Sequence, residues 1–378
     1  MCRDKRILFK NLHVVDVNSN AVQHNVSILS EGQKIAAIGK GIPEVTCDDV
    51  IDCMGMYAMP SLIDMHVHVT FNSMIDGEMS LDNVALNLAQ AAHNGVCIVR
   101  DVGMSPKWSI EAVHNAMPLY PLPKIVFSGA PICVPGGHGW DYGLYVESEK
   151  IDDYMKLHKK AGFTWVKIMN DPENHSLDYM ERLVRCAHYY GLKVACHVFR
   201  EKGIQLAIQS KCDTIEHVVP IQVATIPEEA YYVPTAYSAW VSCKDGYLNS
   251  IPEQDAQYLI EWYNLLKDNL ARAVSSGVKV LCGTDAGCCP SAFGDIVSEI
   301  LTLNMLGMSS QDVLRAATTD SALCLKCYDS YGSIEVGKYA NFFMVHENPL
   351  ENLKTLLCRK MIVLFGTIIK NEVNVPWA

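Results

Sequence analysis

Residues 58–69 read Ala-Met-Pro-Ser-Leu-Ile-Asp-Met-His-Val-His-Val, an apolar run that ends in two histidines one residue apart. Side chains alternate between the two faces of a β-strand, so His66 and His68 should point to the same side. Neutral imidazoles presented together at a strand end can form half of a metal site. A pair of this kind is a weak signal by itself, and its meaning depends on the rest of the chain.

Several other apolar runs carry one polar group and then pass into a loop. These groups are Lys167 in residues 164–169, His197 in residues 193–199, His217 in residues 214–218 and Asp285 in residues 278–287. In a barrel of alternating strands and helices, active-site residues lie where the strands end and the βα loops begin. The pattern therefore predicts that these groups meet at one end of such a barrel.

Eight strand candidates alternate with segments of helical spacing, which predicts an α/β fold with a (β/α)8 TIM barrel. The candidates are Leu62–Val69, Val96–Val102, Lys124–Pro131, Trp165–Asn170, Lys193–Val198, Thr214–Val218, Tyr231–Tyr237 and Val278–Asp285. Residues 58–335 are the predicted barrel, and the 378-residue length leaves room for a small second module.

Both ends of the chain read as short alternating strands separated by polar turns. Neither residues 1–57 nor residues 336–378 can bury a hydrophobic face alone. Chain termini are often close together in folded domains, so we expect the two ends to pair into one small composite β-sandwich.

The composition excludes several classes of protein. The formal net charge of −11 argues against a surface that binds nucleic acid or an anionic membrane, and no uninterrupted apolar stretch is long enough for a transmembrane helix. The N-terminus shows no signal-peptide core. The 15 cysteines are mostly placed in apolar segments and their number is odd, which favours free thiols in a cytoplasmic protein over a disulfide framework. A redox or structural zinc role is the alternative.

The ordered motifs resemble the amidohydrolase superfamily, and the resemblance covers nearly the whole chain. It rests on His66-x-His68, Val166–Met169, His197, Ile215–His217 and Gly283–Gly287. Further stretches are similar to the branch that holds imidazolonepropionase-related proteins and metal-dependent Xaa-Pro (prolidase-like) dipeptidases. These stretches are Val99–Gly103, Gly136–Gly139, Leu314–Thr318 and Gly332–Asn341.

The resemblance implies a binuclear-metal hydrolase that cleaves an amide bond by attack of a metal-bridging hydroxide. The implied ligands of two divalent ions are His66, His68, Lys167, His197, His217 and Asp285. His66 and His68 would hold the more buried ion and His197 and His217 the more exposed one. Lys167 would bridge the two ions as an N6-carboxylated lysine. Zinc is the expected metal, although manganese, iron and cobalt can use the same ligands.

Asp285 would also be catalytic, since it would accept the proton of the hydroxide and pass it to the leaving amine. The resemblance gives His138, in a glycine-rich loop, a catalytic and substrate-binding role at the developing oxyanion. Tyr237 could bind a carboxylate or carbonyl of the substrate, or it could serve packing alone. We expect Arg100 and Asp101 to form a buried structural ion pair.

The loops depart from the usual pattern of the family. Asn170 follows the lysine strand, and Phe199 and Phe293 stand where histidines are frequent. These residues suggest an apolar pocket for a small-molecule substrate, namely a dipeptide or N-acyl amino acid with an apolar or aromatic portion. A cyclic amide or imidazolone-type ring, a lactone or a carbamate is the alternative substrate. A mononuclear deaminase and a non-catalytic scaffold are less favoured, and family habit suggests a homo-oligomer.

Overall fold

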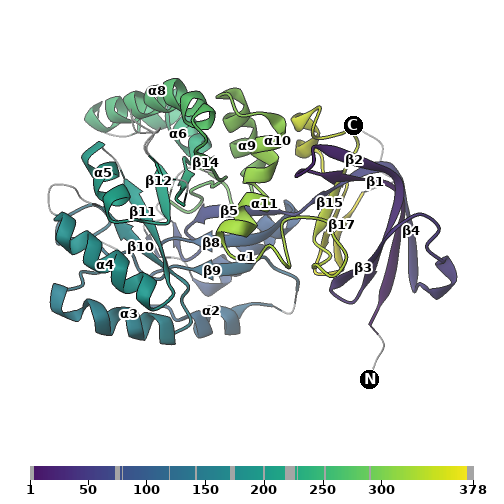
Figure 1. The fold of residues 1–378 in the computed structure, drawn as a ribbon, viewed down its shortest axis with the longest axis horizontal. Helices are drawn as coiled ribbons and strands as arrows, with labels where there is room; N and C mark the ends of the chain where they lie inside the picture. Colours follow the sequence, from purple (N-terminus) through teal and green to yellow (C-terminus); the bar gives the residue numbers. More distant parts are fainter. Residues whose placement is uncertain are drawn as a thin grey trace.

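The computed structural model describes residues 4–72, 77–78, 80–118, 120–140, 143–170, 175–198, 201–217, 226–227, 229–250, 253–288 and 291–372. An α/β body occupies one side of the molecule and an all-β sheet the other (Figure 1). Residues 6–16 and 367–371, near the two ends of the chain, both lie in the all-β sheet. Within the described residues, no helix is long and apolar enough to cross a membrane.

Parallel strands form the centre of the α/β body, and all eight strand candidates are confirmed. The strands are β5 (Leu62–Val67), β8 (Val96–Asp101), β9 (Lys124–Phe127), β10 (Trp165–Met169), β11 (Lys193–Val198), β12 (Thr214–His217), β13 (Tyr231–Val233) and β14 (Lys279–Val280). They form one sheet of order β5-β8-β9 and another of order β10-β11-β12-β13-β14. The last two strands are shorter than expected.

Backbone hydrogen bonds join these two sheets at both of their edges. The amide of Asp285, in the segment after β14, donates to the carbonyl of His66 at 2.8 Å. The amide of Ile132, in the segment after β9, donates to the carbonyl of Lys167 at 2.8 Å. The hydrogen-bonded order therefore returns to β5, and the carboxyl ends of the strands face a common region.

Helices cover the outside of these strands (Figure 1). They are α1 (Leu81–His93), α2 (Ile110–Ala116), α3 (Ile151–Lys160), α4 (Leu177–Tyr189), α5 (Glu201–Gln209), α6 (Ala236–Ser242), α7 (Asp245–Leu248), α8 (Glu253–Ser275), α9 (Ile296–Met305), α10 (Ser310–Ala316) and α11 (Thr319–Cys324). A serine directly precedes each of α1, α2, α4 and α10 as its N-cap. The side chain of each serine accepts a hydrogen bond from a backbone amide in the first turn. Such capping satisfies an amide that the helix itself leaves unpaired.

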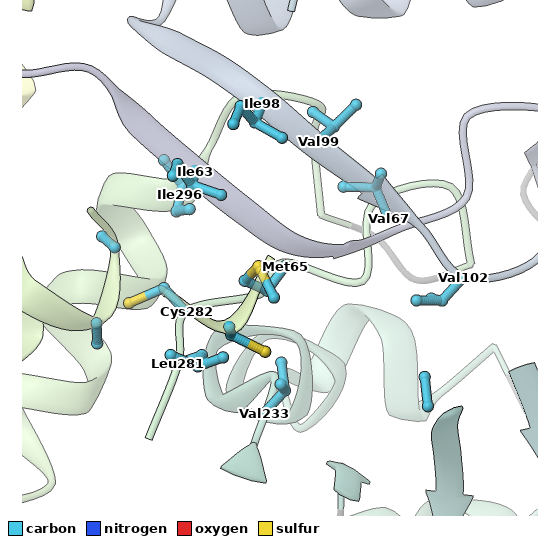
Figure 2. Packing of buried hydrophobic residues seen from close by; sticks show 14 of the residues in the cluster. Ile63, Met65, Val67, Ile98, Val99, Val102, Val233, Leu281, Cys282 and Ile296 are labelled. Carbon is cyan, nitrogen blue, oxygen red and sulfur yellow. The ribbon is translucent and has the colours of Figure 1, made fainter. Parts of the chain in front are cut away.

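Apolar side chains fill the space between the strands and the helices. Figure 2 shows Met65 and Val67 of β5 beside Val99 of β8, with Leu281 and Cys282 of the segment after β14 close by. All five are at most 1% exposed. This packing fixes the ends of β5 and β14 relative to one another, which matters because the site begins there.

The two chain ends pair as expected, and they do so in one hydrogen-bonded sheet of seven strands in the order β17-β16-β15-β4-β1-β2-β3. The strands are β1 (Arg6–Asp16), β2 (Ala21–Glu31), β3 (Lys34–Gly39), β4 (Asp49–Pro60), β15 (Phe342–Val345), β16 (Met361–Leu364) and β17 (Thr367–Asn371). Phe9 and Phe342 meet edge to face at 5.1 Å in the sheet's own apolar core. β4 continues past residue 57, and Ser61 alone separates it from β5.

Short elements complete the described structure. A two-stranded hairpin follows β5, and three 3-10 helices lie in the connections. These elements are β6 (Phe71–Asn72), β7 (Gly77–Glu78), and the 3-10 helices Glu44–Thr46, Ser148–Lys150 and Leu353–Leu357.

Candidate metal centre

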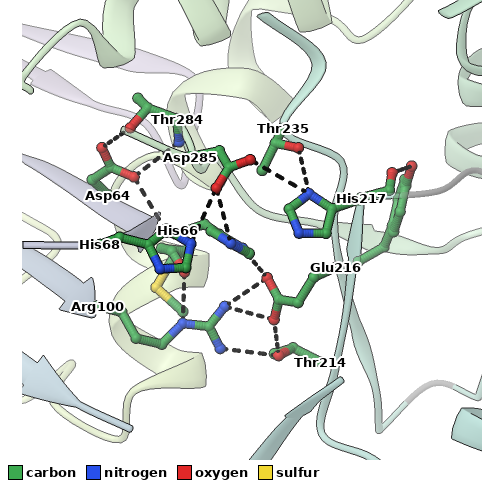
Figure 3. A network of polar contacts seen from close by, with 12 residues as sticks. Asp64, His66, His68, Arg100, Thr214, Glu216, His217, Thr235, Thr284 and Asp285 are labelled. Carbon is green, nitrogen blue, oxygen red and sulfur yellow. Dashed lines mark hydrogen bonds and ion pairs between the residues drawn. The ribbon is translucent and has the colours of Figure 1, made fainter. Parts of the chain in front are cut away.

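Three of the predicted ligands meet at the carboxyl end of β5. His66 lies in β5, His68 follows it, and Asp285 lies in the segment after β14. Their ligating atoms are all within 4.8 Å of one another, and the three residues are buried. Oδ1 of Asp285 lies 3.4 Å from Nε2 of His66 and 3.2 Å from Nε2 of His68 (Figure 3). Two imidazoles and one carboxylate are a donor set that a divalent cation fits.

Two more predicted ligands stand beside this group. His217 ends β12, and its ring centroid lies 4.5 Å from that of His66 and 4.4 Å from that of His197 on β11. Nδ1 of His217 lies 2.9 Å from the hydroxyl oxygen of Thr235. The same nitrogen lies 3.9 Å from Oδ2 of Asp285, and a hydrogen bond to a ring nitrogen fixes the orientation of the ring. Four histidines at the carboxyl ends of β5, β11 and β12 are therefore brought together.

Lys167 lies on β10 and is only 1% exposed. Its Nζ has no hydrogen-bond partner among the described residues. Burial lowers the pKa of Lys167, although the nearby carboxylates of Glu216 and Asp285 act in the opposite direction. An isolated buried amine costs free energy, so its position calls for a partner that the polypeptide does not supply.

The electrostatics of the histidines suit metal binding. Burial, with the charge of Lys167 added, lowers the pKa of His66 to about 4. Burial likewise holds the pKa values of His197 and His217 well below the usual range. Neutral imidazole is the form that coordinates a metal, so these rings need no deprotonation before they bind one.

His68 differs from the other three histidines. Burial would lower its pKa, yet Cys288 and the carboxylate of Asp285 raise the pKa of His68 to about 10. Burial would in turn raise the pKa of Asp285, but the hydrogen bond with His68 and the other histidines keep it below the usual range. The contact between the two side chains therefore binds a positive charge, which is a proton in the protein alone and can be replaced by a cation.

The two predicted substrate-binding residues lie in different surroundings. The exposed ring of His138 stacks on His197, with centroids 4.8 Å apart, so the structure brings it to the cluster. Tyr237 is the second residue of α6, where its backbone amide donates to Glu299 at 2.6 Å and its ring stacks on Trp240. None of the described contacts of Tyr237 is with a predicted metal ligand.

The sequence interpretation missed a buried polar group beneath the histidines. Oε2 of Glu216 lies 2.7 Å from Nδ1 of His66, and Arg100 donates hydrogen bonds to both carboxylate oxygens of Glu216 (Figure 3). Burial alone would raise the pKa of Glu216, but Arg100 and His66 hold it well below its usual range. Glu216 directly precedes the predicted ligand His217, and this was the feature of the sequence that could have placed it near the site.

The expected pairing of Arg100 with Asp101 is wrong. Both residues are buried, but Arg100 binds Glu216, whereas Asp101 accepts the backbone amides of Val69 at 2.8 Å and Gly103 at 3.0 Å. Successive side chains of a strand point to opposite faces, so neighbours on β8 face different partners.

The three residues that depart from the family pattern were expected to line an apolar pocket, and the structure describes two of them, Phe293 and Asn170. Phe293 is 6% exposed and packs in the main apolar core. The side-chain amide of buried Asn170 donates to the carbonyl of Gly203 at 2.7 Å. Phe199 lies outside the described residues.

Comparison with known proteins gives a family. A model of the amidohydrolase family matches residues 57–368. The imidazolonepropionase of Christiangramia forsetii is 23% identical, with 86% of each chain covered. A 5-methylthioadenosine/S-adenosylhomocysteine deaminase of Thermoanaerobacter pseudethanolicus is 22% identical and covers 93% of this chain and 89% of its own.

A solved structure of a Xaa-Pro dipeptidase with bound methionine in its active site superposes with a TM-score of 0.84. The two sequences are 25% identical, and the match covers 96% of this chain and 99% of the dipeptidase chain. The resemblance to imidazolonepropionase-related and prolidase-like proteins is therefore confirmed. The chain belongs to the amidohydrolase family and is a hydrolase that acts on carbon–nitrogen bonds.

Proposed function

We propose that this protein is a binuclear-metal hydrolase that cleaves an amide bond at the mouth of a closed (β/α)8 barrel. The observation that carries the proposal is the buried amine of Lys167, which has no hydrogen-bond partner among the described residues and whose charge acts on three histidines. A neutral amine reacts with carbon dioxide to give a carbamate, and burial favours that neutral form. The carbamate oxygens would supply the missing ligands.

The cluster divides naturally into two metal positions. His66, His68 and Asp285 would hold the first divalent ion, for which zinc is our expectation. His197 and His217 would hold the second. Lys167, as its N6-carboxylated form, would contribute one oxygen to each ion.

The side chains of the protein would then bind and orient the reactants. When bound, the metals would supply a nucleophile at neutral pH by lowering the pKa of water and would polarise the scissile carbonyl. Asp285, held ionised by its histidines, can accept a proton and return it to the leaving amine. His138, stacked on His197, would donate a hydrogen bond to the carbonyl oxygen.

The proposed substrate is a dipeptide or an N-acyl amino acid with an apolar or aromatic portion. The similarity to a Xaa-Pro dipeptidase favours this class. Trp262 of α8 adds a local reason, because its ring centroid lies 6.4 Å from that of His217, a proposed ligand of the second metal. We retain Tyr237 as a candidate substrate-binding residue.

Hydrolysis of a cyclic amide of the imidazolone type is the second candidate function. It is favoured by the similarity to an imidazolonepropionase over most of the chain. The same ligands would serve both reactions, since the same carbonyl chemistry is involved.

We also propose the wider setting of the enzyme. Residues 1–57 and 336–378 would form a composite β-sandwich domain, and residues 58–335 the hydrolase barrel. Every cysteine in the described residues is free, which supports a cytoplasmic location. We propose a homo-oligomer that takes a small-molecule substrate and binds neither nucleic acid nor membrane.

The two substrate classes can be separated by their products. Enzyme loaded with zinc and bicarbonate should release a free amino acid from N-acyl amino acids or Xaa-Pro dipeptides, which a ninhydrin-type assay detects after separation. Ring opening of an imidazolone without release of an amino acid would favour the second candidate. Loss of ammonia from an aminopurine, with neither of these activities, would contradict the proposal.

A further inference from the structure

We propose that Glu216 is a positioning residue of the metal centre, which holds His66 in the one tautomer whose Nε2 lone pair faces Asp285. Arg100 fixes Glu216 in turn. The inference rests on the proposed function, because it takes His66 to be a metal ligand.

The geometry of His66 gives the tautomer. Its Nδ1 lies 2.7 Å from Oε2 of Glu216. An ionised carboxylate can only accept a hydrogen bond, so Nδ1 must carry the hydrogen. Nε2, on the opposite side of the ring, has no hydrogen-bond partner within the described part of the chain and lies 3.4 Å from Oδ1 of Asp285. The ring is therefore arranged to offer a lone pair where the cluster of ligating atoms lies.

Arg100 prevents the carboxylate from turning away. One terminal nitrogen of its guanidinium lies 2.8 Å and 3.0 Å from the two oxygens of Glu216. The other terminal nitrogen donates to the hydroxyl of Thr214 at 2.9 Å, and Nε donates to the carbonyl of Met65 at 2.6 Å. Thr214 also hydrogen-bonds Glu216. The guanidinium is thus bound to β5 and β12, the two strands that carry His66 and His217.

The complete burial of Arg100 and Glu216 argues against a purely stabilising role for this ion pair. Arg100, Glu216, Thr214 and His66 are all 0% exposed, and the guanidinium lies over the ring of Trp165 at 4.5 Å. Removing two charges from water is costly, and proteins in which apolar residues replace such a buried pair are often no less stable. A partner that orients a metal ligand gives this pair a function that apolar side chains cannot replace.

The experiment compares three full-length variants with the wild type. Glu216→Gln removes the charge that requires Nδ1 to be protonated. Arg100→Gln/Glu216→Gln removes both charges, so that no unpaired ion stays buried. Glu299→Gln is a matched control, since Glu299 is equally buried but accepts the backbone amides of Ala236 and Tyr237 instead of a histidine.

Three readouts are taken on each protein. They are the His66 tautomer from ¹⁵N shifts of histidine-labelled apoprotein (assigned with His66→Gln), the zinc dissociation constant of the tighter site from chelator competition, and the melting temperature of the apoprotein. We expect a protonated Nδ1 in the wild type. We expect zinc binding about 10- to 100-fold weaker in both Glu216→Gln proteins, with the melting temperature recovered in the double variant. The control should bind zinc within about threefold of the wild type, which is close to the scatter of such measurements.

Two results would overturn the inference. One is a wild-type His66 protonated on Nε2. The other is a folded double variant that binds zinc as tightly as the wild type, which would make the pair structural. A wild type that binds no zinc would instead refute the proposed function, and the tautomer of the apoprotein would still test the contact between Glu216 and His66.

Discussion

Single side chains set the geometry of the cluster, and one glycine is as important as the ligands. A Cβ atom at Gly103 would lie 2.4 Å from Nδ1 and 2.8 Å from Cε1 of His68. Atoms of a buried ring cannot be approached so closely, so either the ring or the loop after β8 would have to move.

Gly103→Ala should therefore weaken zinc binding at the first metal position and destabilise the fold by about 1–3 kcal/mol. Chelator competition and urea unfolding measure the two effects. Gly246→Ala is the control, because a Cβ there meets no atom within 4 Å. Wild-type zinc affinity in Gly103→Ala would show that His68 does not need its present orientation.

The ring centroid of Trp262 lies 6.4 Å from that of His217, a proposed ligand of the second metal. Trp262→Ala should raise KM for N-acyl amino acids with aromatic acyl groups more than for acetyl analogues, since stacking contributes about 0.5–1.5 kcal/mol beyond burial. The ratio of the two kcat/KM values is the measurement. An equal loss for both substrates would assign Trp262 to packing alone.

At the scale of elements, α9 carries a buried carboxyl group that supports the start of α6. Glu299 accepts the amides of Ala236 at 3.0 Å and Tyr237 at 2.6 Å, which satisfies two amides of the first turn. Burial raises the pKa of Glu299 from 4.5 to about 8, although these two hydrogen bonds act in the opposite direction.

This raised pKa predicts a pH dependence of stability. Between pH 4.5 and about 8 the unfolded chain releases the proton of Glu299 while the native protein retains it. The free energy of unfolding should therefore fall as the pH rises through that window and then level off. Chemical denaturation of apoprotein at pH 5, 6.5 and 8 should show a smaller fall in Glu299→Gln than in the wild type. Identical slopes would mean that Glu299 is already ionised when folded.

Strand positions were predictable from the sequence because each strand of the α/β body lies in a mainly apolar run. The lengths were not predictable in the same way: residues 281–285 look like strand, but only Lys279–Val280 is assigned to β14. Asp285 adopts a positive φ of 57°, which turns the chain out of extended structure just where the ligand is needed.

The proximity of His66, His68 and Asp285 was predictable because each lies near the end of an apolar run, whereas the partner of Arg100 was not predictable. Glu216 is 116 residues away along the chain, and no local pattern joins the two. The place of Phe293 was ambiguous for a similar reason. In the sequence, an aromatic residue after Asp285 fits the wall of a pocket and the apolar core equally well. Such choices depend on the packing of distant elements rather than on periodicity.

At the scale of the whole molecule, the seven-stranded sheet is joined to the α/β body by nearly continuous chain. β4 belongs to the sheet, β5 belongs to the α/β body, and Ser61 alone separates them. Adjacent residues of β15 face opposite ways: Phe342 packs in the core of the sheet and Phe343 in the main core. The sheet therefore contributes to both cores.

Phe342→Ala and Phe343→Ala should each cost about 3–5 kcal/mol and should leave a single unfolding transition. Far-ultraviolet circular dichroism reports the whole chain, and the five described tryptophans, all within residues 108–262, report the α/β body. Coincident transitions by both probes are expected in each variant. A separate early transition in Phe342→Ala, without a change in fluorescence, would make the sheet an independent unit.

The proposed function depends on a centre that holds two metal ions through Lys167. The most direct measurement is metal content per chain, by plasma mass spectrometry, for the wild type and Lys167→Ala loaded with zinc in the presence of bicarbonate. We predict close to two zinc ions per wild-type chain and at most one per Lys167→Ala chain. Two ions in both proteins would contradict the bridging role of Lys167, and none in either would contradict the metal centre itself.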